Sequence, residues 1–187
     1  MANAIVSAIG TQAAQPASGS VTLSTKSWVQ YPDFYLEFDL DAASVPVTDA
    51  TTSGSFGALK LFDFVEGVVT DVSSWQDYTA FAEGAALTGG AGDAVFDIGI
   101  GSVAIAAAAD GALATTSDNI GDEIAITLSG GTATGSKATA LATVLDGSST
   151  PIDIVLNMSG TAATIDASST LAVTGKVIVR GSLIATS

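Results

Sequence analysis

The sequence alternates apolar and polar residues with a period of two, and this pattern constrains the fold more than any other feature. The clearest case is the segment 34–41, which reads FYLEFDLD. Its apolar residues fall on one face of an extended chain, whereas a helix would scatter them around its circumference. The segments 152–158 and 171–183 repeat the pattern. Such alternation indicates half-buried strands, and it predicts solvent-facing positions for Glu37, Asp39, Asp41 and Asp153.

Shorter segments with strand-type composition fill much of the remaining chain, and turns rich in Gly, Asp and Ser separate them. These segments are 21–29, 45–48, 58–64, 68–72, 95–100, 123–128 and 139–145. Roughly eight to ten short strands with turns between them predict an all-β antiparallel sandwich. A jelly roll of two four-stranded sheets suits this number of strands best.

Two segments depart from the period of two. Residues 75–84 follow a pair of serines and end in glycine, so they could form one short capped helix. Residues 104–109 are rich in alanine, but Asp110 and Gly111 follow almost at once. We therefore expect at most one or two short helices.

The composition suggests one domain with an arm. Residues 1–20 are mostly small, which is typical of a flexible N-terminal arm, and we expect residues 21–187 to form a single β-sandwich domain. The apolar residues Ile5, Val6 and Ile9 make the arm a candidate for docking on a neighbour; the alternative is a frayed terminus. The first twenty residues contain no Lys or Arg, so we expect no secretory signal and synthesis in a cytoplasm.

The composition excludes many functions. The chain has 187 residues, no His, no Cys and a net charge of −14 from 19 acidic and 5 basic residues. Without His or Cys it has no serine-protease-type triad, thiolate nucleophile or zinc ribbon. So few cations disfavour binding to a nucleic-acid backbone, and no apolar run is long enough to span a membrane as a helix. We expect a protein that is not an enzyme.

Acidic clusters are the remaining candidates for chemistry. Asp118, Asp122 and Glu123 are weak candidates for calcium ligands, because oxygen atoms are what Ca²⁺ prefers. The spacing of a calcium-binding loop is absent, so a solvated acidic loop is the alternative, and no cofactor is expected. Asn157 begins a sequence that matches a glycosylation site, but it lies in a predicted strand, and we interpret the match as chance.

Two aromatic patches are interface candidates, because large aromatic side chains often anchor binding. Trp28 and Tyr31 belong to the first patch, and Trp75 and Tyr78 to the second. The alternative is that these residues fill the core and the edges of the sandwich.

Three segments together carry a family resemblance: 45–67, 96–120 and 151–177, which include Phe62-Asp63-Phe64, Phe96-Asp97-Ile98 and Pro151-Ile152-Asp153. Their order resembles structural proteins of tailed bacteriophages, especially marine ones, that accompany the major capsid protein as decoration (cement) proteins. The resemblance covers roughly residues 20–187. It implies a β-sandwich subunit, trimeric, bound to the major capsid protein on the outer surface of an icosahedral head.

These observations lead to one functional expectation and two alternatives. We expect a head decoration protein that bridges capsomers on the virion surface, with no contact to nucleic acid or membrane. The first alternative is another virion β-protein, either a tail-tube subunit or a minor jelly-roll capsid protein. The second is a carbohydrate-binding or adhesin sandwich.

Overall fold

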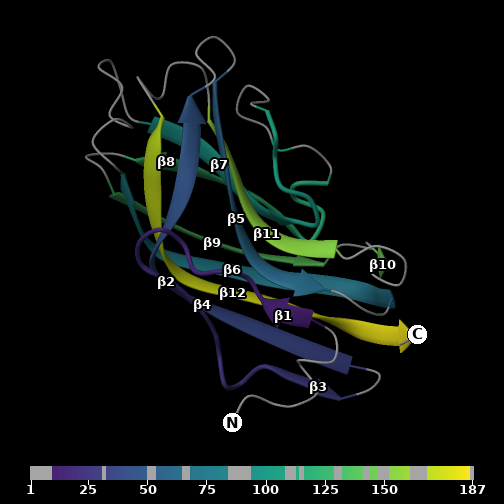
Figure 1. Cartoon of the computed structure of the whole chain (residues 1–187). Coiled ribbons are helices and arrows are strands. Elements are labelled where there is room, and N and C mark those ends of the chain that lie inside the picture. The colour runs from purple at the N-terminus through teal and green to yellow at the C-terminus, as the bar shows by residue number, and fades with distance from the viewer. Residues whose placement is uncertain are drawn as a thin grey trace.

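The structure of the chain is a computed structural model. It describes residues 10–30, 33–49, 54–64, 68–83, 94–107, 113, 116–128, 132–140, 144–146, 152–160 and 168–185. These residues form twelve β-strands and no helix. Figure 1 shows how the labelled strands are arranged. The strands are β1 (Gly10–Gln12), β2 (Ser20–Leu23), β3 (Trp28–Gln30), β4 (Asp33–Asp49), β5 (Ser55–Phe64), β6 (Val68–Glu83), β7 (Ala94–Gly101), β8 (Gly121–Leu128), β9 (Thr132–Ala140), β10 (Leu145–Asp146), β11 (Ile152–Gly160) and β12 (Ser169–Ala185). The described part of the chain therefore contains no helical membrane span.

Eight of these strands form a jelly roll. Hydrogen bonds join all twelve strands into one continuous sheet, which folds into two layers: the first layer, called the first sheet below, has the order β9-β6-β12-β4, and the second has the order β5-β11-β7-β8. All pairs are antiparallel, and the pairing is nested: β4 pairs with β12, β5 with β11, β6 with β9 and β7 with β8. The chain crosses repeatedly between the two sheets, which is the arrangement of a double-sheet jelly roll. The predicted fold class is confirmed.

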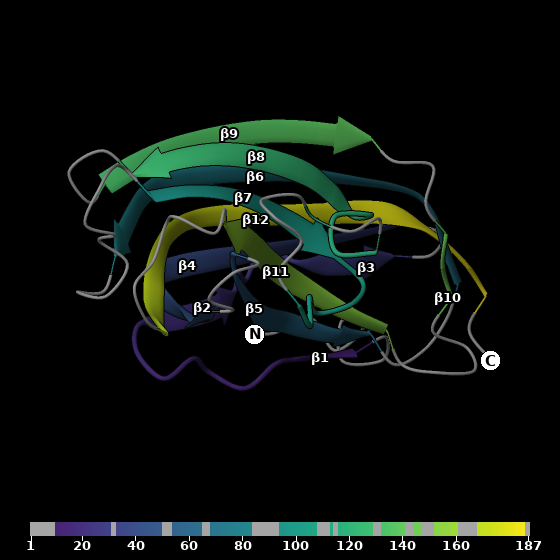
Figure 2. The same cartoon turned by 90° about the horizontal axis from the view of Figure 1, so that it is seen from above.

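The two sheets meet along both of their long sides. On one side the end of β4 hydrogen-bonds to the start of β5, with Val47 opposite Gly57. On the other side β8 and β9 lie beside each other, as Figure 2 shows from above. The sandwich therefore has a narrow, enclosed interior.

The core lies between the sheets and uses the alternating positions of their strands. The inward positions that the sequence predicts for β12 are all buried: Leu171, Val173, Val177, Val179 and Leu183. The rings of Phe38 in β4 and Phe62 in β5 meet edge to face, with their centroids 6.2 Å apart. Each large apolar side chain buried in this way contributes roughly 1.5–3 kcal/mol to stability.

β4 joins two segments that the sequence predicts as separate strands, 34–41 and 45–48. A bulge connects them: Ala42 has a φ of 47°, and the register of β12 shifts opposite it, between Val173 and Gly175. Bulges of this kind bend a strand without ending it. The yellow ribbon of β12 bends strongly in Figure 1.

Other boundaries also differ from the prediction. The segment 21–29 divides into β2 and β3 around a turn, in which Ser27 N–H donates to Ser24 O at 2.9 Å. The segment 139–145 is not one strand, because β9 ends at Ala140 and β10 begins at Leu145.

The short helix suggested at 75–84 is wrong, because β6 runs through Glu83. In β6 every second side chain from residue 72 to residue 78 is buried. Two of these inward positions are the polar residues Ser74 and Gln76. Because inward residues are expected to be apolar, the alternation with a period of two is not visible in the hydrophobicity of this segment. Residues 104–107, the described part of the second suggested helix, have no regular secondary structure.

Residues 10–15 cover a strand edge in each of the two sheets. β1 pairs antiparallel with the last three residues of β5. Gln12 and Gln15 then bond the backbone of β2: Val21 N–H donates to Gln15 Oε1 at 2.9 Å, and Leu23 N–H donates to Gln12 Oε1 at 3.1 Å. Unpaired strand edges invite pairing with other chains, and these two glutamines occupy such an edge.

The structure thus holds residues 10–20 against the sandwich, within the segment that the sequence predicts as a flexible arm. The physical reason is that the glutamine amides offer a donor and an acceptor to the backbone of β2, which composition alone does not reveal. Residues 1–9, with the candidates Ile5, Val6 and Ile9, lie outside the described residues.

Asn157 in β11 fastens the connection between β7 and β8 onto the second sheet. The side chain is fully buried. Its Nδ2 donates to the carbonyls of Val103 at 3.0 Å and Ser117 at 2.9 Å, and its Oδ1 accepts from the N–H of Ile105 at 2.9 Å. A fully buried amide is inaccessible to glycosylation in the folded protein, in agreement with the interpretation of this motif as chance.

We predict that Asn157→Ala lowers the free energy of unfolding by on the order of 3 kcal/mol, because three backbone groups lose a buried partner. Chemical denaturation measures the change. The matched control is Asn119→Ala, which removes a half-buried amide bonded to Ser102 in the same connection and is expected to cost less. Equal losses for the two variants would contradict the fastening role of Asn157.

Candidate functional site

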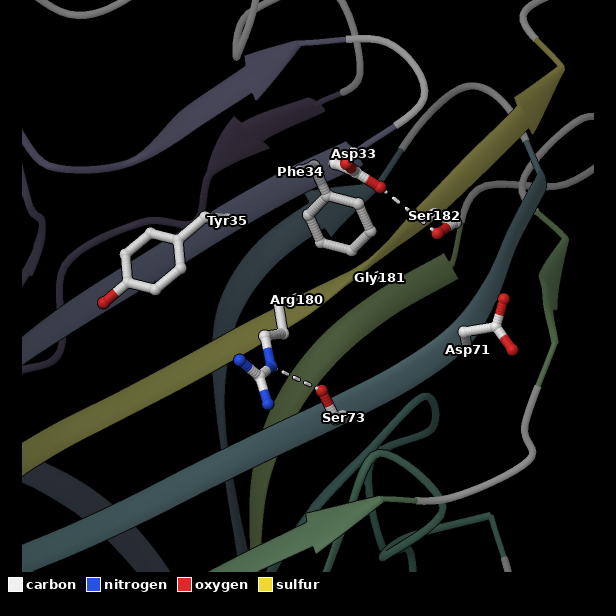
Figure 3. A pocket seen from close by; sticks show the side chains of 8 residues that line it. All are labelled: Asp33, Phe34, Tyr35, Asp71, Ser73, Arg180, Gly181 and Ser182. Atoms are coloured by element: carbon white, nitrogen blue, oxygen red, sulfur yellow. Dashed lines mark hydrogen bonds between the residues drawn. The ribbon is translucent and has the colours of Figure 1, made fainter.

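A hollow of about 330 Å³ opens on the first sheet, where β4, β12 and β6 lie side by side (Figure 3). Its volume lies at the lower end of the range of small-molecule sites, roughly 300–1,000 Å³. Eight residues line it: Asp33, Phe34, Tyr35, Asp71, Ser73, Arg180, Gly181 and Ser182. It is a candidate binding site formed by described residues.

The hollow forms where the ladder between β6 and β12 is interrupted. The register shifts between Arg180 and Ser182, so Gly181 faces two residues of β6 instead of one. One of these two residues is Asp71, whose φ of 53° places it in the left-handed region. Because Gly181 has no side chain, nothing from β12 fills the gap at this bulge.

Arg180 supplies the positive charge of the hollow. Its Nε donates to the hydroxyl of Ser73 at 2.8 Å, and its terminal nitrogens have no hydrogen bond or ion pair within the described residues. Lys26, Lys60 and Lys176, by contrast, each pair with a carboxylate. Arg180 is therefore a cation with free donors in a strongly acidic chain.

Two carboxylates face the same hollow from the neighbouring strands. Asp33 in β4 accepts a hydrogen bond from Ser182 Oγ at 3.3 Å, and Asp71 in β6 accepts one from the adjacent Thr70 Oγ1 at 3.2 Å. Both aspartates are exposed. Figure 3 shows the three charged side chains standing around Gly181. The hollow thus offers both donors and acceptors.

Tyr35 connects the hollow to a buried ionic network on β4. Its hydroxyl donates to Glu37 Oε2 at 2.6 Å, and Lys176 Nζ lies 2.5 Å from Glu37 Oε1. Lys26 approaches the same carboxylate at 3.6 Å, and Lys176 also contacts Asp39 at 3.0 Å. The side chain of Glu37 is only 4% exposed.

Glu37 therefore differs from the predicted solvent-facing position. It does lie on the outward face of β4, but the turn between β2 and β3 and the two lysines cover it. The turn is hydrogen-bonded to the backbone of Glu37: Glu37 N–H donates to the Ser27 hydroxyl oxygen Oγ at 2.9 Å, and Ser24 N–H donates to Glu37 O at 2.7 Å. The period of two predicts on which face of the strand a side chain lies. It does not predict whether other parts of the chain cover that face.

The network shifts the pKa values of its members. Burial alone raises the pKa of Glu37, but the hydrogen bonds from Lys176 and Tyr35 outweigh it and lower the pKa below 4.5. Burial, together with the bond to Glu37, raises the pKa of Tyr35 to about 12. Because the folded state lowers the pKa of Glu37, the network stabilises the fold above pH 4.5 and loses that contribution as the pH falls through the lower, folded-state pKa.

We predict that Glu37→Gln lowers the free energy of unfolding by on the order of 1–3 kcal/mol at about pH 7, because charge-assisted hydrogen bonds are lost. The deficit should shrink as the pH falls through the lowered pKa of Glu37, where Glu37 of the unmodified protein takes up a proton. Denaturant unfolding at neutral pH and over a series of acidic pH values measures the difference. The control is Asp41→Asn, an exposed residue of the same strand, expected to change stability by less than about 0.5 kcal/mol. A deficit independent of pH would refute the ionic role.

The structure separates the predicted interface residues. Trp75 lies on the outward face of β6 with 39% of its side chain exposed, opposite Ile178 in β12 and Ala138 in β9. Trp28 begins β3 opposite Tyr35, but its side chain, like the whole of Tyr31, lies outside the described residues.

Tyr78 is not at the surface. It is fully buried, its hydroxyl donates to Gln76 Oε1 at 2.8 Å, and its ring packs on Phe81 with the centroids 5.2 Å apart. Gln76 Nε2 in turn donates to the carbonyl of Asp122 in β8 at 3.0 Å. Tyr78 is a core residue that helps to join β6 to β8, which is the alternative that the sequence leaves open.

The calcium candidates lie in the turn before β8 and at its start. Glu123 Oε2 accepts from the N–H of Leu113 at 3.2 Å, and Asp122 Oδ1 accepts from the N–H of Glu123 at 3.1 Å. Among the described residues no group of three or more acidic side chains is arranged to hold a metal ion. The structure does not bring Asp118, Asp122 and Glu123 together as such a group.

The sequence did not indicate the hollow. The alternation in β12 correctly places Arg180 outward, but the residues on both sides of Asp71 continue the strand-type pattern and contain no glycine, so they do not indicate a bulge. The one available signal is that Arg180 and Gly181 follow each other in a strand, since a glycine inside a strand often marks a bulge.

Comparisons with known proteins assign no family. No protein-family model matches the chain, and no curated protein matches it. It shows a weak likeness to solved structures of infectious bursal disease virus. For the Gx strain the identity is 12% and the TM-score 0.26, with 88% of this chain and 33% of that chain covered. For the Gt strain the identity is 11% and the TM-score 0.24, with 91% and 39% covered. The chain thus spans between a third and two fifths of the length of these viral chains, and a likeness this weak assigns no function.

Proposed function

We propose that the chain is a structural protein of a virus particle that acts without catalysis. The observation that carries the proposal is the nested eight-strand jelly roll, since double-sheet jelly rolls recur in viral capsid and lectin domains. A fold does not determine a function. The resemblance of three sequence segments to phage decoration proteins narrows the proposal to a head decoration protein.

The chemistry of the described side chains supports a mechanical role. The buried polar groups serve the fold: Asn157 holds a connection, and Gln76 joins two strands of different sheets. The chain has neither His nor Cys, the commonest general base and a reactive nucleophile. In this proposal the protein binds the major capsid protein from the outside of the head and stabilises it by bridging capsomers.

We further propose that the subunits form a trimer that buries Trp75. Trp75 is a large aromatic residue exposed on the outward face of β6. Tryptophan is enriched among the residues that contribute most of the binding energy at protein interfaces. The register places the apolar residues Ile178 and Ala138 on either side of it. Repulsion between chains of net charge −14 favours such a neutral contact over a charged one.

The proposal predicts a stable trimer in solution and saturable binding to heads that lack the protein. Light scattering after size-exclusion chromatography measures the mass, and electron microscopy of decorated heads locates the chain. Decoration should also raise the melting temperature of the heads, because a ligand that binds only the assembled state stabilises it. A monomer without affinity for heads would refute the proposal, and six-fold rings or tubes would favour a tail-tube subunit.

The trimer contact has its own test. We predict that Trp75→Ala weakens trimerisation about 30-fold or more, since truncation at an interface hot spot costs about 2 kcal/mol or more. The matched control is Val103→Ala, another exposed apolar residue, which lies in the connection over the second sheet and should leave the trimer unchanged. Sedimentation measures both variants, and an unchanged trimer in Trp75→Ala places the contact elsewhere.

A further inference from the structure

We propose that the hollow between β4, β12 and β6 binds a neutral saccharide. This assigns the hollow a ligand beyond the structural role proposed above and does not depend on it. The two residues that face it from the core side are Phe34 and Gly181, and its rim carries the hydroxyls, carboxylates and guanidinium described above. Phe34 is almost fully buried, so the polar groups of the rim supply the contacts, and a few convergent polar groups are what give small-molecule sites their specificity.

The charges around Gly181 select the class of ligand. A cationic ligand would meet the guanidinium of Arg180, which repels it. An anionic ligand would meet Asp33 and Asp71 and the negative charge of the whole chain. A neutral ligand that carries both donors and acceptors avoids both penalties and satisfies all three side chains.

Closely spaced hydroxyl groups meet this requirement. Each hydroxyl donates one hydrogen bond and accepts others, so a sugar can donate to Asp33 and Asp71 while it accepts from the free terminal nitrogens of Arg180. Hydrogen bonds to charged groups are stronger than those between neutral groups. The hydroxyls of Ser73 and Ser182, already held by Arg180 and Asp33, fix the positions of these partners.

The backbone at Asp71 is consistent with a role in binding. A φ of 53° favours glycine over any residue with a Cβ, so the carboxylate is kept at a conformational cost. Among the described residues its carboxylate accepts one hydrogen bond, an exposed one from the adjacent Thr70, which contributes little stability. Strained positions of this kind cluster at ligand sites, where the side chain is needed.

Saturation-transfer NMR on the full chain tests the proposal. The neutral probes are the methyl glycosides of glucose, galactose, mannose and N-acetylglucosamine at millimolar concentration. The charged probes are N-acetyl-lysine amide and inorganic phosphate. We expect saturable transfer to at least one neutral glycoside, and neither charged probe should compete with it.

Two variants locate the binding in the hollow. Asp71→Gly removes one acceptor and relieves the backbone strain of the positive φ. It should therefore lower the affinity for the glycoside at least tenfold, while the melting temperature of the protein stays equal or rises. Arg180→Lys keeps the charge but loses the planar fork of donors, and should weaken binding to a similar extent. The matched control is Ala42→Gly, which relieves the other non-glycine residue with positive φ outside the hollow and should leave binding unchanged.

Three results would overturn the assignment. The first is that no neutral glycoside binds. The second is that binding persists unchanged in both Asp71→Gly and Arg180→Lys, which would place the ligand elsewhere. The third is that only the lysine or phosphate probe binds at the hollow. None of these results affects the trimer or its binding to heads, so the two proposals fail separately.

Discussion

The ladder between β4 and β12 is the constraint on which the rest of the molecule depends. β12 lies inside the first sheet, with β4 on one side and β6 on the other, so its register sets both neighbours. The same register buries the apolar residues of β12 and lines up Lys176 with Asp39 and Arg180 with Tyr35. Because the side-chain period of a strand is two, a slip of one residue would turn every one of these side chains to the opposite face.

The sequence predicts the core and the fold class well, because both follow from the alternation in long strands. Phe34, Leu36, Phe38 and Leu40 are buried as expected. When one small domain contains several such alternating strands, only a few fold architectures can bury all of their apolar faces. The prediction fails where polar residues occupy inward positions, as Ser74 and Gln76 do in β6. Their burial depends on partners in other strands, which a local pattern does not contain.

The candidate site was less predictable than the core for a related reason. A bulge arises from the way two strands fit together, and the hollow exists only because β6 and β12 lose register next to a glycine. Three strands that are far apart in the sequence each contribute one charge to it. Trp75 and Tyr78 are both interface candidates in the sequence, with the core as the alternative, and the structure exposes Trp75 but buries Tyr78, since two aromatic residues of one patch need not share a face.

Because the pairing is nested, the fold can be completed only after the last strand, β12, has been synthesised. Lys176 and Glu37 are 139 residues apart along the chain, so the β4–β12 ladder, the outermost of the nested pairs, joins segments made at very different times. Until β12 has been synthesised, β4 and β6 have no strand between them, and the growing polypeptide presents two long unpaired edges. Pairings that span so much of a chain form slowly, which makes the ribosome-bound intermediate the stage most exposed to aggregation and to chaperones.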